Sequence, residues 1–211
     1  MSIRSKRSKS TTSSIIELVV IIGVAVGLAL GIQQWFVKPY RIPSGSMEPT
    51  LAIGQRVLVD RIGMHFGDPH VGEIAVFNPP QNAQSQVCGL ARASGAACSQ
   101  PEPKRSSTYF IKRIVAGPGD EIYIRDGHVF RKSAGKTSFK AEPDHYIKGC
   151  EAGASECNFP TPIRIPAGHW FMMGDNRGES DDSRFWGPVP TGWIVGGAFA
   201  TYWPPDRIGL L

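Results

Sequence analysis

Residues 108–131 read TYFIKRIVAGPGDEIYIRDGHVFR, and this stretch indicates the fold class most clearly. It contains three short runs in which β-branched and aromatic residues alternate with polar ones, a pattern that favours half-buried strands. Glycine and proline interrupt the runs at residues 117–120, and Asp126-Gly127 is a strong signal for a two-residue β-hairpin turn. The stretch therefore predicts strands at residues 108–115, 121–125 and 128–131.

Further runs of the same kind lie on both sides of this stretch, bounded by glycine and proline. They predict strands at residues 55–60, 73–77 and 170–174. The 211 residues include 24 Gly and 17 Pro, spread without a repeat, which suits many turns and short strands better than a helical bundle. No helical periodicity longer than about ten residues follows Ile32. We therefore expect a mainly β domain, a compact sandwich or barrel-like assembly.

Two segments of the predicted domain lack strand periodicity and are rich in polar and small residues. They cover residues 79–107 and 132–162, and each contains two of the four cysteines. Segments of this length and composition usually run over the surface of a domain. We therefore expect both to be surface insertions.

A continuous apolar run precedes the predicted β domain. Residues 15–32 read IIELVVIIGVAVGLALGI, with Glu17 as the one charged residue. As a helix they would be about 27 Å long, close to the roughly 30 Å hydrocarbon core of a bilayer, and Trp35 and Phe36 follow where interfacial aromatics are common. The run is longer than the apolar region of a cleavable signal peptide and lacks the polar face of a core helix. It predicts one uncleaved transmembrane anchor over residues 15–37.

The positive charge of the chain is concentrated before this run. Residues 1–14 read MSIRSKRSKSTTSS, with four basic and no acidic residues, and the formal net charge of the whole chain is +5. Without these four, 19 basic residues face 18 acidic ones, so the remainder carries +1 and gives no support for a nucleic-acid partner. By the positive-inside rule we expect residues 1–14 in the cytoplasm and residues 38–211 on the other side of the membrane.

All four cysteines, Cys88, Cys98, Cys150 and Cys157, follow the apolar run. An even number of cysteines in an exported domain favours disulfides. Three pairings are possible, and Cys88–Cys98 with Cys150–Cys157 would close the shortest loops. A metal site needs tighter spacing such as Cys-x-x-Cys, so the cysteines predict no metal.

The first segment suited to catalysis is residues 42–51, IPSGSMEPTL. Its two prolines restrict the backbone, and Gly45 between Ser44 and Ser46 permits a sharp turn that would expose one hydroxyl. Such a sequence is common in ordinary loops, so its weight depends on the other two segments.

Lys112 is the central residue of the second segment. Alternation along residues 109–114 puts Lys112 on one face with Phe110 and Ile114, so a core-facing orientation would bury it. Burial penalises the charged ammonium and lowers its pKa. A neutral lysine beside a serine is a general base and nucleophile pair, a known variant of the serine triad.

The third segment, residues 174–190, reads GDNRGESDDSRFWGPVP and follows an apolar run. Asp182 and Arg184 are spaced to pair across a turn and hold a loop in shape. Ser180 lies where its hydroxyl would hydrogen-bond a neighbouring group.

Together these segments resemble the characteristic boxes of the bacterial type I signal peptidases, in order and in residue type. The matching stretches are residues 42–51, 110–120 and 174–190, with residues 72–77 as a further box. The similarity covers most of the chain from Lys38 to about Pro190, except the two cysteine-bearing segments. It implies a mostly β, membrane-associated serine endopeptidase that removes signal peptides from exported precursors. It also implies a bacterial inner membrane location, with the catalytic domain on the extracytoplasmic side and no cofactor.

The resemblance implies a role for several residues. Ser46 would be the nucleophile, Lys112 its general base, Ser44 the hydroxyl donor of the oxyanion hole, and Ser180 the residue that orients the lysine. Asp182 and Arg184 match the structural ion pair of the family.

The same resemblance implies where the substrate binds. The precursor would lie as an extended strand between residues 41–43 and residues 110–111. The contacting residues would be Ile42, Pro43, Phe110 and Ile111. Small pockets lined by Ile42 and Ile111 would then favour an Ala-x-Ala sequence before the cleaved bond.

The chain departs from the family pattern at two points. Residues 116–120 read AGPGD where the family usually has Gly-Leu-Pro-Gly-Asp, and one apolar segment stands where many relatives have two. Neither departure removes a catalytic group. Separately, a specialised Ser–Lys peptidase of one secretion or conjugation system is one alternative, and a non-catalytic, membrane-tethered domain that binds envelope partners is another. A Ser–Lys autopeptidase repressor would need a DNA-binding domain, and residues 1–38 contain no helix-turn-helix pattern.

Other chemistries find no support in the sequence. There is no HExxH, P-loop or GxGxxG pattern, so no metal, nucleotide or dinucleotide cofactor is expected. The histidines are expected at the surface or in turns: His65, His70, His128, His145 and His169. The expected partners are precursors bearing signal peptides and a lipid bilayer.

Overall fold

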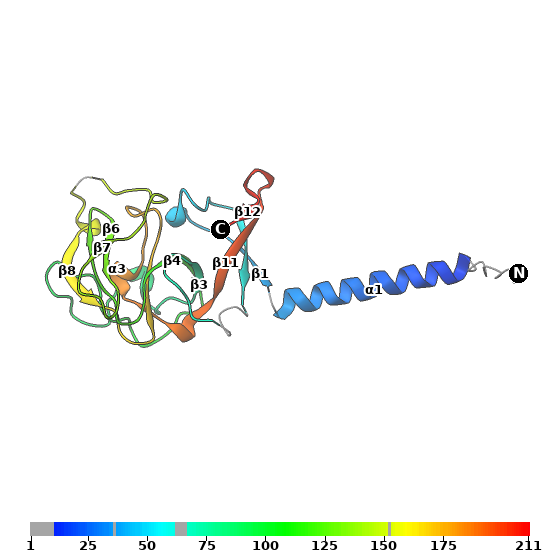
Figure 1. The fold of residues 1–211 in the computed structure, drawn as a ribbon, viewed down its shortest axis with the longest axis horizontal. Helices are drawn as coiled ribbons and strands as arrows, with labels where there is room; N and C mark the ends of the chain where they lie inside the picture. Colours follow the sequence, from blue (N-terminus) through cyan, green and yellow to red (C-terminus); the bar gives the residue numbers. More distant parts are fainter. Residues whose placement is uncertain (1–10, 36, 62–66, 152) are drawn as a thin grey trace, which may run out of the picture.

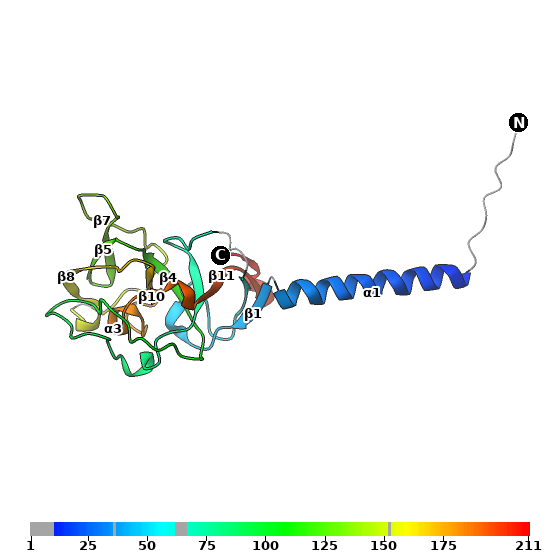
Figure 2. The same ribbon diagram turned by 90° about the horizontal axis from the view of Figure 1, so that it is seen from below.

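The computed structural model describes residues 11–35, 37–61, 67–151 and 153–211. Figures 1 and 2 show a β domain with one long helix projecting from it. The helices are α1 (Thr11–Trp35) and the short α3 (Ser183–Trp186). The strands are β1 Val37–Arg41, β2 Arg56–Asp60, β3 Ile74–Phe77, β4 Phe110–Ala116, β5 Glu121–Arg125, β6 His128–Lys132, β7 Lys140–Ala141, β8 Phe159–Arg164, β9 His169–Met173, β10 Val189–Pro190, β11 Ile194–Trp203 and β12 Gly209–Leu210.

The N-terminal helix α1 contains most of the predicted anchor. Its large apolar side chains from Ile15 to Leu28 are exposed, at 58% and 63% for these two. The helix ends at Trp35, and Val37 already pairs with Asp60 in the sheet, so the helix is shorter at this end than predicted. Across the part of the chain that the structure describes, no helix combines the length and the hydropathy that crossing a bilayer requires. The basic residues before residue 11 lie outside the described residues.

The larger sheet has the strand order β1-β2-β11-β3-β4-β9-β10, with β12 paired to β11, and every pairing is antiparallel. Strand β4, which contains Lys112, lies between β3 and β9. Hydrogen-bonded neighbours on both sides fix its register, with Ala75 opposite Lys112 on β3 and Met173 opposite Arg113 on β9. This central place in the sheet holds the backbone of Lys112 rigidly.

A smaller sheet has the order β7-β6-β5-β8. Its β5–β6 pair is the predicted hairpin: Arg125 pairs with His128, and Asp126 and Gly127 have φ angles of 51° and 80°. Two successive positive φ angles are the signature of the type I′ turn that this dipeptide favours. The prediction of this hairpin is confirmed.

Two apolar clusters stabilise the domain. The larger joins the two sheets and includes Phe77, Ile114, Ile124 and Phe171. The smaller lies against β2, β3 and β11 and includes Met47 and Leu51, both fully buried, together with Ile42, Val57, Val59, Ile74, Val76 and Ala198. Burying a side chain of this size contributes about 1.5–3 kcal/mol. Met47 and Leu51 therefore fix the loop that carries Ser46.

The mainly β fold is confirmed, and so are the six strands predicted from alternation, with ends that differ by one or two residues. The prediction that residues 132–162 lack strands is wrong, because β7 pairs with β6 and β8 begins at Phe159. Pro160 and Pro162 hide β8 in the sequence, but it is an edge strand, where proline is tolerated. Residues 79–107 also lie partly in the core, since Ala96, Ala97 and Cys98 are buried.

The two disulfides have the pairing that closes the shortest loops between cysteines. Cys88 bonds to Cys98 and Cys150 to Cys157, so the shortest-loop pairing is the one present. All four cysteines are therefore oxidised.

Candidate active site

Ser46 lies in a single 3-10 turn, residues Gly45–Met47, directly after the edge strand β1. The turn is closed by the Glu48 N–H donating to the Gly45 carbonyl (3.0 Å), and the Leu51 N–H donates to the Met47 carbonyl (2.8 Å). The buried side chains on both sides of the turn prevent it from moving away from the sheet. Ser46 itself is 8% exposed.

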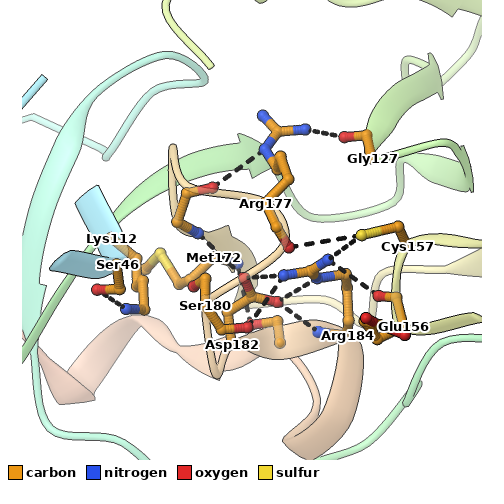
Figure 3. Close-up of polar contacts among 12 residues, drawn as sticks. Ser46, Lys112, Gly127, Glu156, Cys157, Met172, Arg177, Ser180, Asp182 and Arg184 are labelled. Atoms are coloured by element: carbon orange, nitrogen blue, oxygen red, sulfur yellow. Dashed lines mark hydrogen bonds and ion pairs between the residues drawn. The ribbon is translucent and has the colours of Figure 1, made fainter. Parts of the chain in front are cut away.

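Lys112 meets Ser46 from β4, 66 residues further along the chain (Figure 3). Its Nζ lies 2.5 Å from the Ser46 Oγ, and the side chain is 5% exposed. Phe110, on the same face of β4, lies beside it with its ring centroid 5.8 Å from Nζ. The face of β4 predicted from alternation is thus the one that faces inward.

Burial lowers the pKa of Lys112 to about 8, although nearby carboxylates act in the opposite direction. Asp182, Asp181 and Asp175 favour the charged ammonium, and Arg184 disfavours it. At pH 7 a lysine with this pKa is neutral in about a tenth of the molecules, compared with fewer than about one in a thousand for a free lysine. The site therefore supplies a neutral amine near neutral pH.

Ser44 lies at the outer side of the nucleophile turn in extended conformation, with φ −141° and ψ 162°. Its hydroxyl donates to the Ser46 Oγ at 3.4 Å, a long hydrogen bond. The structure therefore brings Ser44 to the reactive hydroxyl, in a part of the loop that is open to solvent.

Ser180 is buried at 5% exposure, and its hydroxyl has no hydrogen-bond partner within the described residues. Its side chain packs against Gly174, where a Cβ atom would overlap both the Ser180 hydroxyl and the Ser46 carbonyl oxygen. Gly174 thus lets the loop after β9 approach both serines. The structure places Ser180 beneath the site but does not join it to Lys112 by a hydrogen bond.

Asp182 and Arg184 form a fully buried ion pair. The Arg184 Nε and Nη2 donate to the two carboxylate oxygens at 2.8 and 2.9 Å, and the Gly174 N–H donates to Asp182 at 3.1 Å. Burial alone would raise the pKa of Asp182, but Arg184 and these hydrogen bonds hold it below its usual range. The predicted spacing therefore produces an ion pair that closes the loop after β9 (Figure 3).

A second network was not predicted from the sequence. Arg113 donates to both oxygens of the buried Asp175, at 2.9 and 2.7 Å, and the Thr50 hydroxyl donates to the same carboxylate at 2.6 Å. The main-chain N–H of Asn176 donates to the Ser46 carbonyl at 3.1 Å, and its side-chain amide donates to the Gly45 carbonyl at 3.2 Å. Polar residues directly after a buried strand were the signal, but only the fold shows what they bind.

A groove of about 720 Å³ runs along β1 and β4 and reaches Ser46 and Lys112. All four predicted contact residues line it: Ile42, Pro43, Phe110 and Ile111. Ser44, Tyr40, Tyr109 and Asp181 also line the groove. The groove therefore joins the predicted substrate-contact residues to the Ser46–Lys112 pair.

The departure from the family pattern at residues 116–120 has a structural counterpart. A Cβ atom at Gly117 would lie 2.7 Å from the Trp170 ring, so the tryptophan occupies the space that a larger residue would need. Asp120 closes the turn by accepting from the Gly117 N–H at 3.0 Å and the Ala134 N–H at 2.9 Å. The altered residues change packing and remove no group from the site.

The described histidines lie away from the groove. His70, His128 and His145 are exposed and His169 is half-buried, while His65 lies outside the described residues. Among the residues with described positions, no group of three or more His, Cys, Asp or Glu side chains could hold a metal ion.

Comparison with known proteins agrees with this geometry. The chain matches the family described as signal peptidase, peptidase S26, over residues 15–203. It is 34% identical to a probable signal peptidase I-2 of Synechocystis sp., over 98% of this chain and 81% of that protein. It is 35% identical to a probable signal peptidase I-1 of the same organism, over 92% and 86%, and 33% identical to a signal peptidase I of Leptolyngbya laminosa, over 94% and 85%. The chain therefore belongs to the signal peptidase family, peptidase S26.

Proposed function

We propose that this protein is a serine endopeptidase that removes N-terminal signal peptides from exported precursors, with Ser46 as nucleophile and Lys112 as general base. The observation that carries the proposal is the 2.5 Å contact between Lys112 Nζ and Ser46 Oγ in the wall of the groove. Membership of the family and similarity to proteins named signal peptidase I support the substrate class.

In the first step, neutral Lys112 accepts the proton of the Ser46 hydroxyl as the oxygen attacks the carbonyl carbon of the scissile bond. A new C–O bond forms, and the carbonyl oxygen becomes an oxyanion. Lys112, now an ammonium, then gives its proton to the leaving amine as the C–N bond breaks. The mature protein leaves, and the signal peptide remains as an ester on Ser46.

The oxyanion would accept hydrogen bonds from the Ser46 N–H and the Ser44 hydroxyl. The Ser44 hydroxyl lies 3.4 Å from Ser46 Oγ, so it is close to where the new oxyanion forms. A donor of this kind typically contributes about 3–4 kcal/mol of transition-state stabilisation.

Hydrolysis of the ester repeats the same proton transfers with water. Lys112 accepts a proton from water as its oxygen attacks the ester carbonyl, and returns the proton to Ser46 Oγ as the signal peptide leaves. The Ser180 hydroxyl is buried beneath the pair, and we assign it to orienting Lys112 when the lysine turns from Ser46 to water.

Two free strand edges support binding of the precursor as an extended strand. Strand β1 is the edge of the larger sheet, and the ladder between β4 and β9 covers only Arg113–Ala116. The N–H and carbonyl of Ile42 are already bound to Gln55 and Gly54. Arg41, Pro43 and residues 110–111 are therefore the positions whose main-chain groups could pair with a peptide that adds a strand. Ile42 and Ile111 on either side would restrict the pockets to small side chains such as alanine.

We also assign α1 to anchoring the domain at the bacterial inner membrane, with residues 1–14 in the cytoplasm and residues 38–211 outside. The support is the row of exposed apolar side chains from Ile15 to Leu28, on a helix that projects from the domain (Figure 1). Exposed apolar area of this kind is unfavourable in water and favourable in hydrocarbon.

Extraction of membranes with alkaline carbonate should leave the full chain in the pellet. Release into the supernatant would contradict the anchor.

The catalytic proposal is tested with the detergent-solubilised full chain and a precursor carrying Ala-x-Ala before the cleavage site. Ser46→Ala and Lys112→Met should each lower kcat by about 10³-fold or more. Matched controls are Ser94→Ala and Lys136→Met, which change exposed residues of the same type and should cleave like the wild type. Equal cleavage by Ser46→Ala and the wild type would contradict the nucleophile role of Ser46, whereas absence of cleavage by the wild type would favour a non-catalytic envelope domain.

A further inference from the structure

The second cysteine pair lies outside the sequence motifs of the family, yet its segment contacts the loop beneath Lys112. We define the disulfide strap as residues 148–151 and 153–157, closed by Cys150–Cys157. At its N-terminal end, the Lys148 N–H donates to the Asp175 carbonyl at 2.8 Å, and the Arg177 N–H donates to the Lys148 carbonyl at 2.9 Å. This end of the strap therefore holds the start of the 174–184 loop.

The C-terminal end of the strap holds the other end of the loop. Arg184 Nη1 donates to the Glu156 carbonyl at 3.0 Å and approaches the Cys157 sulfur at 3.8 Å. The same guanidinium binds Asp182 through Nε and Nη2. Figure 3 shows Arg184 joining Asp182 to Glu156 and Cys157. The orientation of the Asp182–Arg184 pair therefore depends on the position of residues 156 and 157, which the disulfide restrains.

Arg177 links the disulfide strap to Gly174, the residue directly after β9 that lies close to the Ser46 carbonyl. The Cys157 sulfur lies 3.6 Å from the Arg177 carbonyl oxygen, and the Arg177 guanidinium donates to the carbonyls of Gly174, at 3.0 Å, and of Gly127. Gly127 in turn donates its N–H to the Cys157 carbonyl at 2.9 Å. Hydrogen bonds therefore connect Cys157 through Gly127 to Arg177 and Gly174, and the sulfur of Cys157 lies in contact with the same arginine residue.

We propose that the disulfide strap positions the 174–184 loop beneath Lys112, so that the rate of the chemical step depends on the Cys150–Cys157 bond being oxidised. The inference rests on the proposed function. Cys150 and Cys157 are positioning residues, since the contacts described for them are with the loop and not with the groove that receives the substrate.

The sign of the effect follows from the charges around Lys112. Asp182, Asp181 and Asp175 favour its ammonium form, while burial and Arg184 oppose it. When the disulfide is absent, we expect Arg184 to lose its contacts with Glu156 and Cys157 and to neutralise the charge of Asp182 less well. We also expect the 174–184 loop to be less tightly held, so that water reaches Lys112. Both changes raise the pKa of Lys112. The neutral fraction of the base falls at a given pH, whereas the groove walls on β1 and β4 are unchanged.

The first experiment compares the pH dependence of kcat for the detergent-solubilised wild type and Cys150→Ser/Cys157→Ser. In the variant, the acid limb of the plot of kcat against pH should move to higher pH by about half a unit to one unit. Its kcat at pH 7 should be about three- to tenfold lower, with KM within about twofold. The matched control is Cys88→Ser/Cys98→Ser, whose disulfide closes a loop of similar length and which keeps the main-chain contact from Cys98 to Arg184 (2.9 Å). Its profile should stay at the wild-type position.

A second experiment avoids any folding defect of the variants. Dithiothreitol reduces the protein disulfide to two cysteine thiols and is itself oxidised to a cyclic disulfide, so two electrons and two protons pass from the reagent to the protein. In the Cys88→Ser/Cys98→Ser background, dithiothreitol should cause the same shift of the acid limb, and reoxidation should reverse it. Cys150→Ser/Cys157→Ser should not respond to the reductant.

The outcomes separate this inference from the proposed function. An unchanged acid limb in both Cys150→Ser/Cys157→Ser and the reduced enzyme overturns the positioning role, even if the free energy of unfolding falls. A loss expressed only in KM also overturns it. Absence of precursor cleavage by the oxidised wild type contradicts the proposed function instead.

Discussion

The guanidinium of Arg113 binds both carboxylate oxygens of Asp175, at 2.9 and 2.7 Å, from the strand position next to Lys112. Because the Thr50 hydroxyl donates to the same carboxylate, one buried group joins the nucleophile loop, the lysine strand and the loop after β9. The geometry of the Ser46–Lys112 pair therefore depends on residues that do not contact the reacting atoms.

Replacing this carboxylate should test that dependence. Asp175→Asn leaves Arg113 without its charged partner, and hydrogen bonds to charged groups contribute about 1.5–3 kcal/mol each. We expect the free energy of unfolding to fall by at least about that amount, and kcat to fall with it. Urea unfolding and precursor cleavage measure the two effects. The control is Asp206→Asn at an exposed position, expected within about 0.5 kcal/mol of the wild type. An Asp175→Asn variant as stable and active as this control would contradict the prediction.

Ser44 should act in the transition state and not in binding. Ser44→Ala removes one oxyanion donor, so kcat should fall by about 10²–10³-fold with little change in KM. Ser44→Thr keeps a hydroxyl and suits the extended backbone at this position, so it should retain most of the activity. Steady-state kinetics on a precursor distinguishes the cases. A purely KM effect of Ser44→Ala would show that the hydroxyl binds substrate instead.

The Asp182–Arg184 pair should make stability depend on acid pH. The pKa of Asp182 is held below its usual range, so its contribution is fully present above the unfolded-state pKa of about 3.9 and is lost as the pH falls through the folded pKa. At pH 7, Asp182→Asn leaves Arg184 buried without a counter-charge and should cost about 3–5 kcal/mol. Chemical unfolding from pH 7 to pH 3 should show the two proteins converging at the acid end. A constant difference over this range would contradict the assignment.

The turn after the lysine strand offers a packing test. Gly117→Leu restores the residue type usual in the family but places a side chain against Trp170, so we expect destabilisation of about 1–3 kcal/mol. Adding Trp170→Ala removes the clash, and the double variant should be less affected than the sum of the two single changes. Thermal unfolding of the wild type, the two single variants and the double variant measures this coupling free energy. Simple additivity would mean that Gly117 and Trp170 do not share space.

Local alternation was sufficient to predict the strands that carry or flank Lys112, and it failed where tertiary contacts decide. Strand β11 contains Gly196 and Gly197, which weaken any strand pattern. Added Cβ atoms there would overlap the Asp60 carbonyl and the Glu73 side chain. These glycines permit β11 to pair with both β2 and β3, a requirement that only the assembled sheet reveals.

The candidate site also combines features that the local sequence predicts with features that depend on tertiary contacts. Strand alternation indicated an inward-facing Lys112 and the turn residues indicated an exposed hydroxyl near Gly45, while the resemblance to the type I signal peptidases implied the roles of Ser46 and Lys112. Arg113 and Thr50 lie 62 and 125 residues from Asp175, Gly127 lies 50 residues from Arg177, and Glu156 of the disulfide strap lies 28 residues from Arg184. A local pattern contains no information about such contacts.

The most direct test of the central claim is the pH dependence of kcat/KM for precursor cleavage by the wild type. If neutral Lys112 is the base, the value should rise about tenfold per pH unit below pH 8 and level off above its pKa of about 8. A profile that is flat through this range, or one that keeps rising to the pKa of a free lysine near 10.4, would contradict the buried-base mechanism.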